Sequence, residues 1–202
     1  MIDIAHQISA IVRQVAADDE TATVTLQRRY PAEVSDVWEA ITDPDRVRRW
    51  FLPLTGDLRP GGTFQLEGHA GGQIISCEPP AHLAVTFGGE NSLVDVRLSA
   101  DGEQTLLILE HAVPLSLAGS AAGALYVGPG WDGALMSIGL YLDGKVADNP
   151  VAAANSPEGQ QFCVESIDAW TAAVEITGTA DAEAIAAGRQ AALAQFAPDL
   201  VG

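Results

Sequence analysis

A series of short strand-like segments, with glycine and proline turns between them, constrains this chain more than any other feature. The segments fall at 63–67, 73–78, 82–87, 93–99 and 105–113. Turn signals such as Gly71-Gly72 and Asp101-Gly102 bound them. No stretch of helical length lies between them, and parallel strands would need a crossover of a dozen or more residues. The spacing therefore predicts consecutive antiparallel strands over residues 58–112.

Two helical patterns and one strand precede this series. Residues 21–30 are rich in β-branched side chains that alternate with apolar ones, which predicts a strand. The apolar residues from Val34 to Ile41 then recur at helical spacing. Asp43 is a good N-cap for a second, short helix through Arg49. A strand followed by two helices is therefore expected before the antiparallel series.

A long helix is expected after the strands. Residues 114–130 are rich in glycine and alanine, and with Gly128-Pro129-Gly130 they are interpreted as a loop that ends at a helix. The following apolar residues form one helical stripe: Trp131, Leu135, Ile138 and Leu142. Gly144 is placed to end this helix.

Both ends of the chain are also predicted to be helical. Isoleucine and valine recur at helical spacing near the start, which predicts an amphipathic helix over about 2–16. In the tail, helices are expected to begin at Ser156 and at Asp181, the second running to about Phe196. The first has an apolar stripe of Phe162, Ile167, Trp170 and Val174. We expect this stripe to pack on the domain or on a partner subunit, and a homodimer is one such arrangement.

The charge of the chain excludes several classes of partner. The chain has 202 residues, of which 27 are Asp or Glu and 10 are Lys or Arg, a formal net charge of −17. A polyanionic surface repels phosphate, so neither nucleic acid nor an anionic membrane is expected as a partner. At 48% hydrophobic residues the chain can bury a sizeable core. No apolar run reaches the length of a membrane span and the start lacks a secretory pattern, so we expect a cytoplasmic protein.

Motifs for catalysis and metal binding are missing from the sequence. Two cysteines exclude a disulfide framework and a multi-cysteine zinc site. The sequence contains no Gly-x-Ser-x-Gly, no phosphate-binding loop and no His-Glu-x-x-His. The four histidines fall on separate predicted elements without ligand spacing. We therefore predict no catalytic residue, no metal and no cofactor.

Large apolar and aromatic residues are the strongest positive signal for a site. A curved antiparallel sheet against one helix often leaves an interior space, and an apolar pocket is the default binding site. We expect the helix that begins near Trp131 to face the sheet across this space, with the opening near Trp50 and Phe51. The predicted ligand-binding residues are Trp38, Trp50, Phe51, Phe64, Leu66, Val85, Phe87, Leu109, His111, Trp131, Leu135 and Ile138.

Two polar features keep alternatives open. Glu110 and His111 are adjacent on a strand and so point to opposite faces. His111 is interpreted either as a general acid or base or as a hydrogen-bonded structural histidine. The basic cluster at 46–49 is either an anion-binding lip of the pocket or a solvated helix face that pairs with Asp43 and Asp45.

Several short motifs, in this order, resemble the START-like (SRPBCC) superfamily and most closely its subgroup named after activators of the heat-shock-protein-90 ATPase. They are 26–31 (LQRRYP), 37–44 (VWEAITDP), 49–51 (RWF), 56–64 (GDLRPGGTF), 77–80 (CEPP), 109–111 (LEH) and 130–132 (GWD). The tail at 156–159 (SPEG) and 169–170 (AW) resembles an extension of bacterial members. The resemblance covers about residues 21–142.

The resemblance implies an α+β helix-grip fold, in which a curved antiparallel sheet wraps around a long C-terminal helix. We expect a helical arm at 1–20, the helix-grip domain at 21–142 and a helical extension at 143–202. Members bind lipids, hormones or polyketides, and some are cyclases or dehydratases. We therefore expect a non-catalytic carrier or sensor of a small hydrophobic molecule, with a polyketide cyclase or dehydratase as the alternative. Regulation of a chaperone ATPase is a third hypothesis, although residues 1–17 do not provide the N-terminal chaperone-binding domain of the eukaryotic activators.

Overall fold

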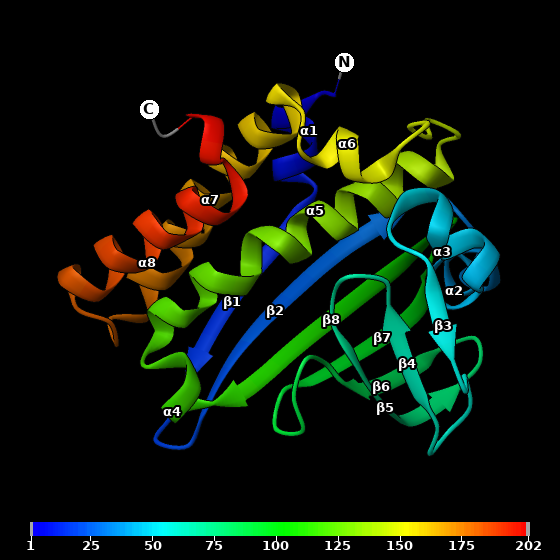
Figure 1. The fold of residues 1–202 in the computed structure, drawn as a ribbon, viewed down its shortest axis with the longest axis horizontal. Coiled ribbons are helices and arrows are strands. Elements are labelled where there is room, and N and C mark those ends of the chain that lie inside the picture. Colours follow the sequence, from blue (N-terminus) through cyan, green and yellow to red (C-terminus); the bar gives the residue numbers. More distant parts are fainter. Residues whose placement is uncertain (1, 201–202) are drawn as a thin grey trace. The chain divides into compact units, whose positions relative to one another are not determined.

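A computed structural model describes residues 2–200 and divides the chain into two compact units. Unit 1 comprises the described parts of 1–26, 112–136 and 151–202, and unit 2 comprises 27–111 and 137–150. The eight strands hydrogen-bond in the order β1-β2-β8-β7-β6-β5-β4-β3 (Figure 1). Their bounds are β1 Ile11–Ala17, β2 Thr21–Tyr30, β3 Leu54–Gly56, β4 Thr63–Leu66, β5 Gly71–Glu78, β6 His82–Thr86, β7 Leu93–Asp101 and β8 Gln104–Pro114.

The helices fall into short and long ones. The α-helices are α1 Ile4–Ser9, α2 Val34–Thr42, α3 Pro44–Trp50, α4 Leu115–Ala118, α5 Ala124–Leu142, α6 Pro150–Ala154, α7 Pro157–Thr177 and α8 Ala182–Phe196. Two 3-10 turns, η1 Ala121–Gly123 and η2 Pro198–Leu200, complete the described elements. No helix within residues 2–200 combines the length and the apolar character that crossing a bilayer requires.

The antiparallel meander of unit 2 confirms the prediction from turn spacing. Neighbouring strands from β3 to β7 pair antiparallel, for example with Leu83 opposite Val96 in the β6–β7 pair. In β8 the alternate residues Thr105, Leu107 and Leu109 are buried together with His111. Because successive strand residues point to opposite faces, this places His111 on the apolar face of β8.

The two helices α2 and α3 follow their sequence signals. The α2 stripe buries Val37, Trp38 and Ala40. Asp43 caps α3 as predicted, since its carboxylate accepts a hydrogen bond from the Asp45 amide at 2.8 Å. Pro44 occupies the first turn of α3, where its missing N–H costs nothing.

The predicted helix over residues 2–16 is wrong for most of its length. Only α1 is helical, and β1 follows it after one residue. The spacing of Ile4, Ile8, Ile11 and Val15 fits a helix, but β1 itself alternates in burial, with Ile11 buried and Val12 half exposed. β-Branched residues favour an extended strand, and pairing beside β2 outweighs the local helical pattern.

The loop predicted at 114–130 is also wrong, because α4, η1 and the first two turns of α5 lie there. Gly128-Pro129-Gly130 is inside α5 rather than before it. Pro129 lies near the beginning of the helix, and small residues here allow close packing. A Cβ atom at Gly128 would lie 2.5 Å from the Trp170 ring, so the glycine is required by the neighbouring helix.

The tail of unit 1 confirms the two predicted helix starts. Ser156 caps α7 through a bond from the Gly159 amide, and Asp181 caps α8 through the Ala184 amide. The two helices lie side by side (Figure 1). The predicted apolar stripe of α7 is fully inside unit 1: Phe162, Ile167, Trp170 and Val174 are each at most 1% exposed.

Candidate functional site

An aromatic row crosses unit 2 and is the first candidate site. It begins at Trp50, the last residue of α3, whose ring stacks on Phe51 with centroids 5.5 Å apart. Phe51 contacts His69 at 5.8 Å, and His69 contacts Phe87 at 6.0 Å. We use the name aromatic row for these four rings and the two that Phe87 also contacts, Phe64 at 6.2 Å and His111 at 6.3 Å.

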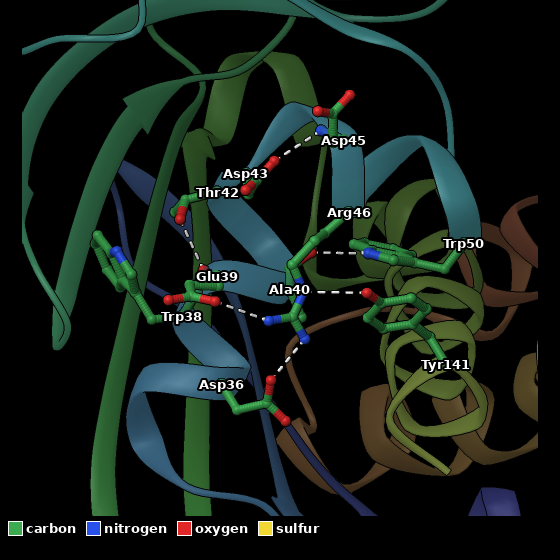
Figure 2. Close-up of polar contacts among 10 residues, drawn as sticks. All are labelled: Asp36, Trp38, Glu39, Ala40, Thr42, Asp43, Asp45, Arg46, Trp50 and Tyr141. Carbon is green, nitrogen blue, oxygen red and sulfur yellow. Dashed lines mark hydrogen bonds and ion pairs between the residues drawn. The ribbon is translucent and has the colours of Figure 1, made fainter. Parts of the chain in front are cut away.

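Local structure fixes the two ends of the row. The Trp50 indole Nε1 donates a 2.8 Å hydrogen bond to the Ala40 carbonyl in α2, which holds the ring against the α2–α3 pair (Figure 2). At the other end His111 is only 6% exposed, and its Nε2 lies 2.8 Å from the Ser92 hydroxyl. The rings between them are partly exposed, so the row leads from a surface to a buried polar group.

Burial sets the charge of His111. Removal from water disfavours the charged imidazolium and lowers the pKa of His111 to about 4. At neutral pH the ring is therefore uncharged, and it offers a neutral hydrogen-bonding group within apolar surroundings. A base with so low a pKa accepts protons poorly near neutrality, which makes His111 a weak general base and no general acid there.

The structure brings together only part of the predicted ligand-binding set. Trp50, Phe51, Phe64, Phe87 and His111 are in the aromatic row. The other predicted residues of unit 2 are buried in its core: Trp38, Leu66, Val85, Leu109 and Ile138. Trp131 and Leu135 belong to unit 1, where Leu135 is buried and Trp131 is partly exposed.

His69 is a member of the row that the sequence did not predict. It lies in the exposed turn between β4 and β5, and its ring bridges Phe51 and Phe87. A lone histidine in a turn carries no sequence signal for such a contact. Among residues 2–200 no group of three His, Cys, Asp or Glu side chains is arranged to hold a metal ion.

Two of the three arginines of the α3 basic cluster, Arg46 and Arg48, form ion pairs within unit 2. Arg46 donates to Asp36 at 2.6 Å, to Glu39 at 3.0 Å and to the Tyr141 hydroxyl at 3.0 Å (Figure 2). Arg48 pairs with Asp45 as predicted, at 3.2 Å. The predicted pairing with Asp43 is wrong for Arg46, because the Asp43 carboxylate caps α3 and the acids of α2 take its place. The Arg49 guanidinium lies over the Tyr141 ring at 5.3 Å. The pairing of Arg46 and Arg48 favours the second of the two interpretations, a helix face that pairs with neighbouring acids.

A second polar centre lies in unit 1 around Asp132. This carboxylate in α5 is completely buried and accepts hydrogen bonds from Arg13 Nε at 2.8 Å and Trp170 Nε1 at 3.1 Å. The Ser166 hydroxyl donates a short bond of 2.5 Å to the same oxygen. Burial raises the pKa of Asp132, while Arg13, Ser166 and Trp170 act in the opposite direction. No local sequence signal marks this centre, because Arg13, Asp132 and Ser166 are far apart in the chain.

Comparisons with known proteins assign the fold. The family model described as Activator of Hsp90 ATPase homolog 1-like protein matches residues 31–143. The crystal structure of CalU16 from Micromonospora echinospora is 37% identical, with a TM-score of 0.68, and the match covers 82% of this chain and 98% of that one. No curated protein sequence matches the chain significantly.

Two further structures are similar over different lengths. DynU16, a protein in the dynemicin biosynthetic locus, is 25% identical with a TM-score of 0.54, and the match covers 63% of this chain and 48% of that one. The conserved protein EF2215 of unknown function from Enterococcus faecalis is 16% identical with a TM-score of 0.59, over 84% of this chain and 95% of that one. The similarity to EF2215 is a similarity of fold alone. Together with CalU16 these structures agree with the α+β helix-grip fold expected from the sequence.

Proposed function

The chain belongs to the family of Activator of Hsp90 ATPase homolog 1-like proteins, and we propose that it binds a small hydrophobic molecule without transforming it chemically. The proposed binding residues in unit 2 are the aromatic row and the core residues Trp38, Leu66, Val85, Leu109 and Ile138. Trp131 and Leu135 of unit 1 belong to the same proposal on the strength of the sequence pattern alone. The domain that binds is the helix-grip domain over 21–142.

The aromatic row carries the proposal. Four partly exposed rings, Trp50, Phe51, Phe64 and Phe87, give apolar contact surface, and the row ends at a buried imidazole. Ligand sites typically combine many apolar side chains with a few polar groups that fix orientation. An uncharged His111 beside Ser92 suits a hydroxyl or carbonyl group on an otherwise apolar, lipid-like or polyketide-like molecule.

The similar structures support a small-molecule role. DynU16 is a protein in the dynemicin biosynthetic locus. That location carries no activity over to this chain. It supports testing biosynthetic intermediates and their analogues before lipids in general.

Ligand binding is tested with a neutral, apolar fluorescent probe such as Nile red and with native mass spectrometry of freshly purified protein. We expect probe uptake by the wild type, a tenfold or greater loss in Phe87→Ala and a smaller loss in Phe87→Leu. Ile75→Ala is the control, since Ile75 is a half-exposed residue of β5 outside the row. Equal uptake by all four proteins would exclude the aromatic row as the site.

A second experiment with the same purified protein distinguishes binding from catalysis. The purified chain is incubated with a small-molecule extract, and the extract is analysed by mass spectrometry before and after. A bound component that is recovered unchanged supports a carrier or sensor. A component that loses water or isomerises, with the conversion abolished in His111→Gln, would instead establish the cyclase or dehydratase alternative. Stimulation of a chaperone ATPase by the chain would establish the third hypothesis.

A further inference from the structure

Unit 1 has a groove of about 510 Å³ between β1 and α7, which we call the β1–α7 groove. Its walls are residues 13–16 of β1, Thr25 of β2, and the face of α7 from Ala169 to Thr177. The α7 wall is made largely of alanine, and Ile176 at its end is 86% exposed. This volume is in the range of small-molecule sites, and its surface is mainly apolar.

Arg13 gives the groove a charged side chain, one nitrogen of which makes no hydrogen bond. Its side chain is only 8% exposed. Nε donates to Asp132, and Nη1 donates to the carbonyls of Ile8 at 3.0 Å and Ile11 at 2.8 Å. A guanidinium has five N–H donors, and the remaining two are on Nη2. Nη2 is buried and has no hydrogen-bond partner among residues 2–200, and the same is true of Oδ1 of the Asp132 carboxylate that Nε binds.

A buried donor without a partner is costly, so a molecule that supplies an acceptor oxygen there gains affinity. The three satisfied donors fix the guanidinium plane between β1 and α5. Nη2 is the one nitrogen of this guanidinium that the described residues leave without a hydrogen bond. Because Nη2 lies below the surface, the occupant has to insert its acceptor between the groove walls.

The charge around Arg13 selects the occupant further. The positive charge of Arg13 is balanced by Asp132 at 2.8 Å. A carboxylate bound at Nη2 would lie beside this buried carboxylate, in a chain whose net charge is −17. Like charges in a low-dielectric site repel strongly, whereas a ketone, ester or amide oxygen adds no charge.

From the groove, the orphan donor and the balanced charge, we propose that the β1–α7 groove is a second binding site, for a neutral apolar molecule that presents one acceptor oxygen to Arg13 Nη2. Residues Val15, Ala169, Ala173 and Ile176 contact its apolar part. This site is in unit 1 and uses no residue of the aromatic row, so it stands or fails independently of the function proposed above.

Three naphthalenes of similar shape test the proposal by amide chemical-shift titration of the ¹⁵N-labelled full chain. They are 2-acetylnaphthalene, which has a neutral acceptor, 2-isopropylnaphthalene, which has none, and 2-naphthoate, which is anionic. We expect the ketone to shift amides of 13–16 and 169–177 and to bind there roughly tenfold more tightly than the other two, the factor that one satisfied hydrogen bond provides.

Variants then assign the contacts. Ala173→Phe fills the groove and should abolish the shifts at 169–177. Ala187→Phe makes the same change on the exposed face of α8 and should leave them unchanged. Arg13→Lys keeps a positive charge beside Asp132 but removes Nη2, so it should reduce ketone affinity to that of 2-isopropylnaphthalene and leave the latter as it was.

Several outcomes would overturn the proposal. Shifts confined to residues of the aromatic row would place binding elsewhere. Equal affinity for the ketone and the hydrocarbon in the wild type would show that Nη2 takes no part. Tightest binding of 2-naphthoate would make the groove an anion site. If Arg13→Lys does not fold, the wild-type affinity ratio and Ala173→Phe still decide the outcome.

Discussion

Burial determines the protonation of His111 and, through it, the acid stability of the chain. The pKa of His111 is lowered to about 4 in the folded state, whereas an unfolded histidine has its ordinary value of 6.5. Between these values the unfolded state binds more protons than the folded one, so the free energy of unfolding falls as pH falls from 6.5 to 4. The loss is on the order of 3 kcal/mol over that window.

Urea denaturation at pH 7 and pH 4.5 measures this loss, and His111→Asn should remove much of the difference between the two pH values. An NMR titration of the His111 ring should give a midpoint below pH 5. A midpoint near 6.5 would mean that the ring is hydrated in solution and would contradict its placement in the core of unit 2.

Two glycines of α5 should respond in opposite directions to the same change. In Gly128→Ala the new Cβ meets the Trp170 ring at 2.5 Å, so a buried contact has to shift and stability should fall by roughly 1–3 kcal/mol. In Gly133→Ala nothing lies within 4 Å of the new Cβ, and alanine is the better helix former, so stability should rise by roughly 0.5–1 kcal/mol. Both free energies of unfolding are measured in urea. Equal effects would show that α7 does not pack against Gly128.

At the scale of elements, α7 should be required for the folding of unit 1. Its four buried apolar residues and the Ser166 and Trp170 bonds to Asp132 are lost when 150–202 are deleted. The deletion would leave Asp132 with Arg13 as its remaining hydrogen-bond donor and would expose a large apolar patch. We therefore expect aggregation or a lower Tm. Deletion of 201–202 alone is the control, because it keeps the two hydrogen bonds between Asp199 and the buried Gln160 of α7. An unchanged Tm and a monodisperse product after the long deletion would contradict the packing of α7.

Elements were predictable where a local signal and the tertiary environment agree. The caps Asp43, Ser156 and Asp181 set helix starts correctly, because a capping bond involves only neighbouring residues. The strand at 11–17 was not predictable, since its pairing with β2 is absent from the local periodicity. The helical part of 114–130 was missed because Gly128 and Pro129 were interpreted as helix breakers, whereas here small size is what the Trp170 ring requires.

The two candidate sites also differ in how far a local sequence signal marks them. Five of the six residues of the aromatic row could be named from the sequence, because large apolar side chains signal a buried face. His69 could not, because a single histidine in a turn is not part of an apolar pattern. The Asp132 centre could not be named from the sequence. Neither Arg13 in β1 nor Ser166 in α7 has a local pattern that indicates a bond to Asp132 in α5. The division into 1–20, 21–142 and 143–202 stays a prediction.

On the scale of the whole molecule, net charge governs the response to salt. With 27 acids and 10 Lys or Arg, the folded chain repels itself. Exposed ion pairs such as Arg29–Asp101, with side chains about half exposed, are worth little each. Screening is stronger at high ionic strength, so Tm should rise by a few degrees between 0.01 and 0.5 M sodium chloride, as calorimetry would show. Choline chloride is the control for specific sodium binding. A falling Tm would mean that ion pairs outweigh the repulsion.

The bond between Arg13 and Asp132 also sets an order of events during synthesis. The two residues are separated by 119 positions, and Ser166 follows 34 positions after Asp132. Until the last third of the chain has been synthesised, Ser166 and Trp170 are not yet bound to Asp132. We therefore expect the Arg13 guanidinium to stay hydrated during this time. Contacts of such high sequence separation form late and slow folding. The N-terminal strand should therefore be open to proteases on nascent chains and become protected only after α7 has emerged.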